Sequence, residues 1–181
     1  MNKINPLIKS LCPVLLLIST WGHADVLVNV TAQMLTPACN IAMGMGKGSN
    51  VEFGRVQVED LKKNLEPTQE FRIDITGCDF GNKVVGLAML PKMGSVVEYN
   101  SQSLLTTTTD GLAISFKDKA NGKSLKPDGS VQSINLTKYS DISLSKTRFA
   151  TLKVQLINTK PVDELELGPF QAVITLLAQY L

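Results

Sequence analysis

Gly168-Pro-Phe-Gln-Ala-Val-Ile-Thr-Leu-Leu-Ala-Gln-Tyr-Leu181 is an apolar run with a hydrophobic side chain at every second position. Successive side chains of a β-strand point to opposite faces, so one face would carry Phe170, Ala172, Ile174, Leu176, Ala178 and Tyr180. No Gly or Pro interrupts the run after Pro169, which indicates a long strand. We expect a strand this apolar to be buried against its own domain, a partner, or both.

The first 24 residues have the pattern of a secretory signal. Lys3 and Lys9 make a basic leader, and Leu11–Ile18 is an apolar core too short to span a bilayer. Gly22 and Ala24 are small residues at the two positions that a signal peptidase reads. We therefore predict that the chain is exported and that its mature part begins at Asp25. The alternative, an uncleaved membrane anchor, fits the short core poorly.

The composition of the mature part excludes several functions. Of 18 basic and 16 acidic residues, 16 of each remain once Lys3 and Lys9 leave, so nothing indicates a nucleic-acid partner. His23 is the one histidine of the chain and leaves with the signal. The mature part therefore cannot build a Ser/His/Asp or Cys/His centre, or a zinc site that uses imidazole. We expect no catalytic residue, no metal and no cofactor, and hence no enzyme.

Two cysteines, Cys39 and Cys78, remain in the mature part. An even pair in an exported protein is typical of a disulfide, whereas two free buried thiols are much less common there. The bond would close a loop of about 40 residues, which is worth about 3–4 kcal/mol in the chain-entropy model.

A second alternating stretch lies at the start of the mature part. Polar residues separate Val26, Val28, Val30, Ala32 and Met34, and Thr36-Pro37 ends the pattern. Periodicity alone leaves two interpretations open, an ordinary first strand of the domain or a detachable extension in front of a domain that starts at Cys39.

The rest of the chain consists of short strand patterns separated by turn signals. We expect strands over 51–56, 71–76, 83–90 (ended by Pro91), 112–116 and 149–157, and a hairpin turn at Asn121-Gly122. Residues 58–68 would form a loop or one helical turn, and 92–110 a loop or an edge strand. The acidic segment 161–167 carries Asp163, Glu164 and Glu166. These carboxylates could support hydrolysis, but a solvated loop is the interpretation we favour. Because no 3.6-residue periodicity is sustained, the pattern predicts an all-β sandwich.

These features occur together in one known family. The signal, the alternating arm that ends in Pro-Ala-Cys39, the second cysteine after Phe71–Gly77, and the ending from Gly168 to the penultimate Tyr180 resemble pilins of the chaperone–usher pathway. The resemblance covers the whole mature part, and the arm is most similar to that of minor or tip-adaptor subunits. It implies a signal peptide (1–24), an N-terminal donor-strand extension (25–37) and a pilin domain (38–181). The domain would be an immunoglobulin-like β-sandwich that lacks its last strand.

The resemblance also implies a function and its partners. The chain would be a structural subunit of a cell-surface fimbrium, exported through the periplasm, that polymerises by donor-strand exchange and supports adhesion. Its partners would be a periplasmic chaperone, an outer-membrane usher and neighbouring pilins. The donor side chains would be Val26, Val28, Val30, Ala32 and Met34, and the chaperone- and subunit-binding strand would carry Gly168, Phe170, Ala172, Ile174, Leu176, Ala178 and Tyr180. Ala32 stands where the family usually has glycine. The alternative is a tip adhesin or another secreted β-sandwich that binds a ligand.

Overall fold

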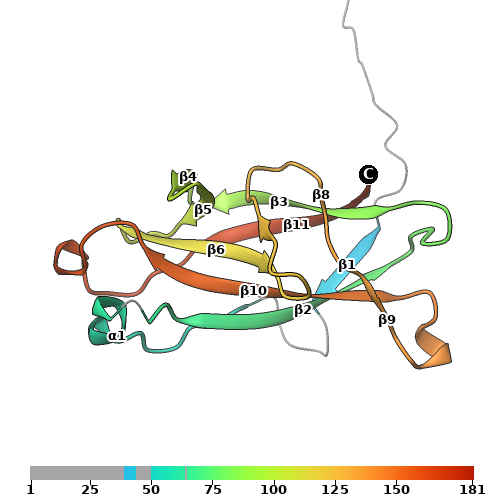
Figure 1. Ribbon diagram of the computed structural model, residues 1–181, viewed down its shortest axis with the longest axis horizontal. Helices are drawn as coiled ribbons and strands as arrows, with labels where there is room; N and C mark the ends of the chain where they lie inside the picture. The colour runs from blue at the N-terminus through green and yellow to red at the C-terminus, as the bar shows by residue number, and fades with distance from the viewer. Residues whose placement is uncertain (1–38, 44–49, 64) are drawn as a thin grey trace, which may run out of the picture. The chain divides into compact units, whose positions relative to one another are not determined.

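The computed structural model describes residues 39–43, 50–63 and 65–181 (Figure 1). All of them belong to one compact unit, which spans residues 35–181. The signal, the alternating arm with Val26, Val28, Val30, Ala32 and Met34, and the glycine-rich residues 44–49 lie outside the described residues.

The larger of two antiparallel sheets contains most of the strands. Its order is β1-β2-β10-β6-β5-β4, and β7 and β9 add to β6 and β10. The bounds are β1 Asn40–Met43, β2 Thr68–Thr76, β4 Val96–Tyr99, β5 Gln102–Thr106, β6 Leu112–Asp118, β7 Ser124–Leu125, β9 Thr137–Lys138 and β10 Arg148–Asn158. β10 alternates between buried and half-buried residues, and so does the second half of β2 from Arg72 to Thr76, as one sheet face against a core requires.

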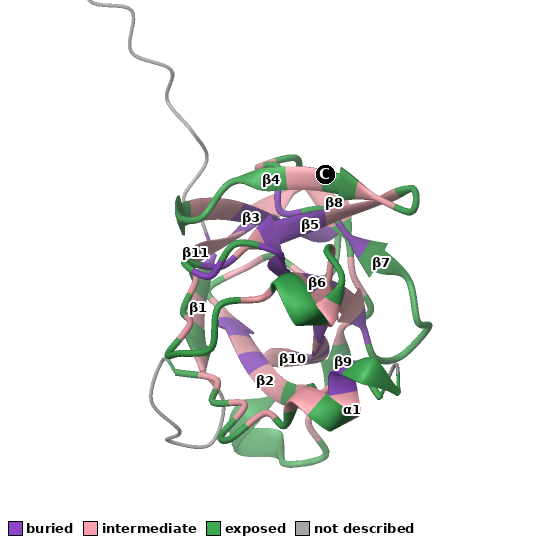
Figure 2. Ribbon diagram, turned by 90° about the vertical axis from the view of Figure 1, so that its left-hand side faces the viewer, coloured by how far each residue is buried: buried purple, intermediate pink, exposed green. Residues whose placement is uncertain are grey.

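The smaller sheet has the order β11-β3-β8 and forms the other layer (Figure 1). Its strands are β3 Val85–Met93, β8 Gln132–Ser133 and β11 Val173–Tyr180. The core between the sheets includes the fully buried Ile73, Ile75, Leu87, Met89 and Leu152. In Figure 2 the buried segments line the inner sides of the two layers. The predicted all-β sandwich is therefore confirmed.

Three short helical segments lie in the connections of the described residues: α1 Val58–Lys62, η2 Ile142–Leu144 and η3 Val162–Glu164. The first is the single helical turn that was one of two expectations for residues 58–68. Within the described ranges, no helix is long and apolar enough to cross a membrane.

One sequence prediction about a strand limit was wrong, whereas the loop or edge strand expected over 92–110 is present as the edge strand β4. Pro91 does not end its strand, because β3 continues to Met93 and Pro91 lies opposite Ile174, where the register of β11 shifts. A proline is tolerated at such an irregularity because no regular ladder bond needs its missing N–H. Residues 92–110 contain a hairpin of β4 and β5, whose turn residues Asn100 and Ser101 both have positive φ.

The predicted disulfide is present, and its Cys39 lies at a point where the two sheets meet. Cys39 and Cys78 are bonded, with their Cα atoms 5.1 Å apart. Cys39 also forms an antiparallel bridge with Ala178 of β11. Because β1 pairs with β2 along its other edge, this bridge joins the larger sheet to the smaller one at a single point.

Candidate functional site: an open apolar groove

One wall of the groove is the outer edge of β11. The strand pairs with β3 from Val173 to Tyr180, and among the described residues only Cys39 pairs with its other edge, at Ala178. The predicted apolar face turns towards the core, and its members are Phe170, Ala172, Ile174, Leu176, Ala178 and Tyr180. Ala178 is fully buried, whereas Ile174 and Leu176 remain half-buried. The face therefore lacks cover along most of the strand.

The segment before β11 is less regular than the sequence predicted. Gly168, Pro169 and residues 170–172 are outside the strand, and Gly168 is exposed. Gln171 is held instead by the β5–β6 loop: its backbone N–H donates to Thr108 Oγ1 (3.1 Å), and its carbonyl accepts from the Thr108 N–H (2.9 Å). These bonds hold the start of the apolar face beside that loop.

The second wall is the segment 50–57, which connects β1 towards α1. Val51, Phe53 and Val56 are half-buried, but the alternation breaks after Phe53 because Gly54 and Arg55 are both exposed. The predicted strand over 51–56 is wrong, because the chain bends at Gly54, which has a positive φ, and the segment belongs to no sheet ladder of the described chain. Half-buried apolar side chains without a ladder are what a missing neighbouring strand would leave behind.

Core side chains form the floor between the two walls. They come from β2, β5, β6 and β10, and they are Phe71, Leu105, Ile114, Phe116 and Val154. The space above them is about 1110 Å³, which exceeds the usual range of a small-molecule pocket. Glu52 and Arg55 are the only charged residues among those that line it. A long apolar space of this kind suits an extended peptide with few charges.

The two ends of the groove are closed differently. Near α1, Phe53 and Phe170 contact each other across the groove, with their ring centroids 6.2 Å apart. At the other end the bridge between Cys39 and Ala178 fills the edge of β11. Past it, the Asp79 N–H donates to the Tyr180 hydroxyl (2.8 Å), and the Lys83 ammonium lies 4.6 Å from the centre of the Tyr180 ring. The open edge therefore ends at Ala178, so the predicted binding residue Tyr180 lies beyond it.

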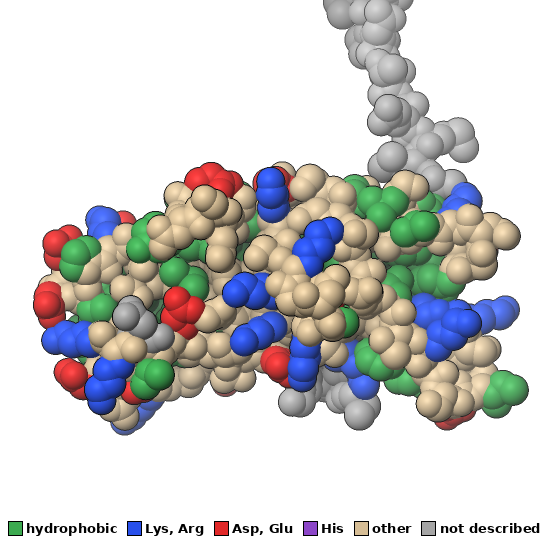
Figure 3. All heavy atoms as spheres, viewed as in Figure 1, with side chains coloured by type: hydrophobic (Ala, Val, Ile, Leu, Met, Phe, Trp, Pro, Cys, Tyr) green, Lys and Arg blue, Asp and Glu red, His purple; other side chains and the backbone are tan. Residues whose placement is uncertain are grey.

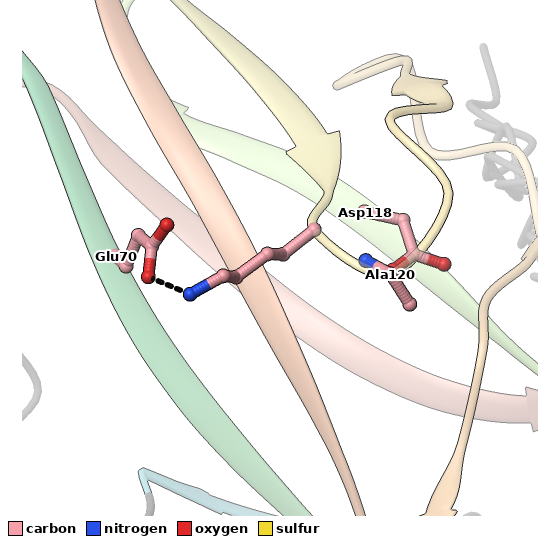
Figure 4. A network of polar contacts seen from close by, with 4 residues as sticks. Glu70, Asp118 and Ala120 are labelled. Carbon is pink, nitrogen blue, oxygen red and sulfur yellow. Dashed lines mark hydrogen bonds and ion pairs between the residues drawn. The ribbon is translucent and has the colours of Figure 1, made fainter.

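A buried acid at the end of β6, Asp118, was not predicted from the sequence. Asp118 is fully buried and accepts hydrogen bonds from the Ala120 N–H (3.0 Å) and from the backbone and side-chain amides of Asn135 (2.8 and 2.9 Å). Figure 4 shows it beside the ion pair of Lys119 and Glu70. Because its bonds are made within the domain, Asp118 is a structural residue; its place at the end of an alternating strand was the only signal in the sequence.

The groove contains no arrangement typical of a metal site. Within the described ranges, no three His, Cys, Asp or Glu side chains are close enough to share a metal ion. The groove can therefore be described by shape and apolar surface alone.

The comparisons with known proteins agree with this geometry. The family model "Fimbrial protein" matches residues 28–180. The chain belongs to the fimbrial protein family, which is a family of structural subunits. It is a pilus subunit, and its family implies a place in the surface fimbrium. No curated protein sequence matches the chain.

Solved pilus structures share its fold. The P pilus rod subunit PapA is 24% identical, with a TM-score of 0.56, and the match covers 87% of this chain and 100% of PapA. A subunit in a structure of a chaperone–usher pilus is 20% identical, with a TM-score of 0.57 and coverages of 89% and 97%. The CupB6 tip adhesin from Pseudomonas aeruginosa is 18% identical, with a TM-score of 0.52; the match covers 78% of this chain and 38% of the adhesin. The immunoglobulin-like pilin fold is thus confirmed.

Proposed function

We propose that this chain is a fimbrial subunit that polymerises by donor-strand exchange, with the groove between β11 and residues 50–57 as the acceptor. The observation that carries the proposal is an uncovered apolar floor beside the open edge of β11. Such an edge normally invites pairing with another chain, and natural proteins cover or charge it. Here neither wall carries a row of charges, so the groove is suited to be filled.

An inserted strand would satisfy both walls at once. Its backbone would bond to the outer edge of β11 and lie beside the segment 50–57, while alternate side chains would pack on Phe71, Ile114 and Val154. Each valine-sized side chain that becomes fully buried contributes about 1.5–3 kcal/mol. Several such side chains make insertion favourable even though the donor must be ordered.

The donor in this proposal is the N-terminal extension of a neighbouring subunit. Its side chains would be Val26, Val28, Val30, Ala32 and Met34, which the sequence places on one face of a strand. Before assembly, a periplasmic chaperone would lend a strand to the same groove, and exchange would occur at the outer-membrane usher. The segment from Phe170 to Ala178 would form the receiving edge in both complexes, and Tyr180 would lie at the closed end beyond it. Adhesion would follow from the assembled fibre.

Deletion of residues 25–36 tests this proposal. If the arm is a donor, the deleted chain still folds and binds a peptide of residues 25–36, but it no longer adds to another subunit. If the arm is an ordinary first strand, deletion removes several valine-sized contacts and approaches the roughly 5–15 kcal/mol stability of a whole domain. Collapse of the deleted chain would therefore contradict the proposal.

A pair of peptide variants provides the matched control. Val30→Asp places a charge on the apolar face of the donor, whereas Asn29→Asp places the same charge on the opposite face. We expect only the first peptide to lose binding, because it would bury an unpaired carboxylate. Equal loss for both peptides would show that the arm does not bind as a strand.

A further inference from the structure

The two ends of the long strands carry opposite charge. Strands β2 and β6 both run antiparallel to β10. The segments that precede β2 and β6 therefore meet the segment that follows β10. We call this end the acidic end, and it contains residues 58–67, 107–111 and 159–172. Residues 77–84 and 138–148 meet at the other, the basic end. The 11 residues of β10 separate the two ends by about 35 Å.

The acidic end has an excess of carboxylates. Seven acidic residues and three lysines lie in its segments: Glu59, Asp60, Glu66, Asp110, Asp163, Glu164 and Glu166, with Lys62, Lys63 and Lys160. Two of the lysines are already paired within this end, Lys62 with Asp163 and Lys160 with Asp110. Glu164 and Glu166 are exposed and form no ion pair with another described residue.

The basic end has the opposite balance. It carries Lys83, Lys138, Lys146 and Arg148, against Asp79 and Asp141. The excess stays positive when the carboxylate of Leu181 is included. None of these four cations is in an ion pair with another described residue. In Figure 3 blue side chains predominate at the right-hand end, whereas red and blue are interleaved at the left-hand end.

Exposed apolar side chains also gather at these ends. Ile142 is 89% exposed and Val84 64% exposed at the basic end, and Leu167 is 80% and Leu65 59% exposed at the acidic end. Exposed apolar residues beside charged ones are typical of a surface that meets a partner. This observation is independent of charge, and it points to the same two surfaces.

The short connection between the arm and the domain would bring the same two surfaces together in a pair of joined copies. β11 runs from Val173, near the acidic end, to Tyr180, near the basic end. Every strand pair in the described sheets is antiparallel, and antiparallel pairing is slightly more stable than parallel pairing. A donor strand that pairs with β11 in this direction would place Met34 near the acidic end of the acceptor. Five residue steps connect Met34 to Cys39, and they span at most about 18 Å. Cys39 itself is bonded to Cys78, next to the basic end of the donor.

We infer that the partner at each end is a second copy of this chain: the basic end of one copy packs against the acidic end of the copy that receives its arm. The inference rests on the proposed function, and it makes the chain a repeating subunit that fits its own copies. Contacts of this head-to-tail kind produce an open filament. Opposite charges brought within about a Debye length also raise the rate of association.

The test compares two ways of displacing a labelled arm peptide from the groove of the mature chain. One competitor is the free peptide 25–36, which has no ends; the other is the full mature chain, which has both. The measured quantity is the displacement rate with the full chain divided by the displacement rate with the free peptide. In the competing chain we would change Lys138→Glu and Lys146→Glu, with Lys123→Glu and Lys126→Glu, on exposed residues away from both ends, as the matched control.

We expect the basic-end variant to lower the ratio about tenfold at low salt, and the control to leave it unchanged. Glu164→Lys and Glu166→Lys in the receiving chain should restore the ratio, and 1 M salt should abolish the difference. An unchanged ratio, or an equal fall in the control, would overturn this inference alone. If the free peptide never enters the groove, the proposed function fails, and this inference fails with it.

Discussion

Two strand edges of this domain differ although both lie at the margin of a sheet. β4 is four residues long, carries Glu98 and is joined to β5 by a tight turn. β11 is twice as long and lies beside a groove floored by core side chains. Within the described part of the chain, β4 pairs on one side only, and β11 has a single bridge on its outer side.

The difference indicates that only the edge of β11 is built to receive another strand. A short edge strand that carries a charge is a usual protection against unwanted pairing, and β4 has both features. β11 has half-buried Ile174 and Leu176 where a covered strand would bury them fully. Of the two edges compared, β11 is the one where open backbone lies beside uncovered core.

The largest expected effect concerns the disulfide of Cys39, the residue that pairs with the β11 edge at Ala178. Changing both Cys39 and Cys78 to Ser should lower the free energy of unfolding by about 3–4 kcal/mol, because the unfolded chain loses a 39-residue constraint. Urea unfolding of the two proteins measures this. A loss below about 1 kcal/mol would show that the disulfide contributes little to the stability of the domain.

A pair of leucines compares covered with uncovered core. Leu152 of β10 is fully buried, so Leu152→Ala should cost about 3 kcal/mol whether or not the arm peptide is present. Leu176→Ala should cost about 1 kcal/mol in the empty domain, and more once the peptide covers Leu176. Urea unfolding with and without peptide gives both values. Equal costs for Leu176→Ala in the two states would contradict a groove that is filled on binding.

A charge on either edge tests which one binds. Ile174→Asp should weaken binding of the arm peptide by about 100-fold, or about 2.7 kcal/mol, because the inserted strand would bury the carboxylate. Val96→Asp, at a partly exposed position of β4, should leave the affinity unchanged. Titration calorimetry measures both. Loss of affinity on changing Val96 would move the binding edge to β4.

The smallest effect concerns pH at the closed end of β11. The hydrogen bond from the Gly81 N–H, followed by that from the Asn82 side chain, holds the pKa of Asp79 below its ordinary 3.8. A depressed pKa contributes stability that is present above the unfolded value and is lost as pH falls through the folded one. Asp79→Asn should therefore show a slightly smaller fall in Tm between pH 6 and pH 2.5 than the natural chain. Identical curves would show that this turn makes no pH-dependent contribution.

The sequence predicted the parts of the fold that a strand determines by itself. The alternation from Phe170 to Tyr180, the disulfide and the sandwich class all follow from local pattern and cysteine count. The limits of β3 did not, because Pro91 lies at an irregularity that depends on its partner strand. The turn at Asn100 and Ser101 was missed because Asn-Ser is a weaker hairpin signal than Asn-Gly.

The groove was only half predictable. One wall was expected as the C-terminal strand, but residues 51–56 were expected to form a strand of a sheet. The chain bends there at Gly54, which breaks the predicted alternation, and the described chain provides no neighbouring strand for a ladder. The floor could not be read from the sequence, because Phe71, Leu105, Ile114 and Val154 meet only through the sheet order.

Hydrogen exchange on the arm-deleted chain tests the central claim most directly. Amide exchange would be followed by mass spectrometry with and without a saturating peptide of residues 25–36. We predict that the peptide slows exchange in residues 170–178 and in residues 50–57, and leaves β4 and β5 unchanged. Binding that protects the hairpin of β4 and β5, or that leaves both walls of the groove unprotected, would contradict the account.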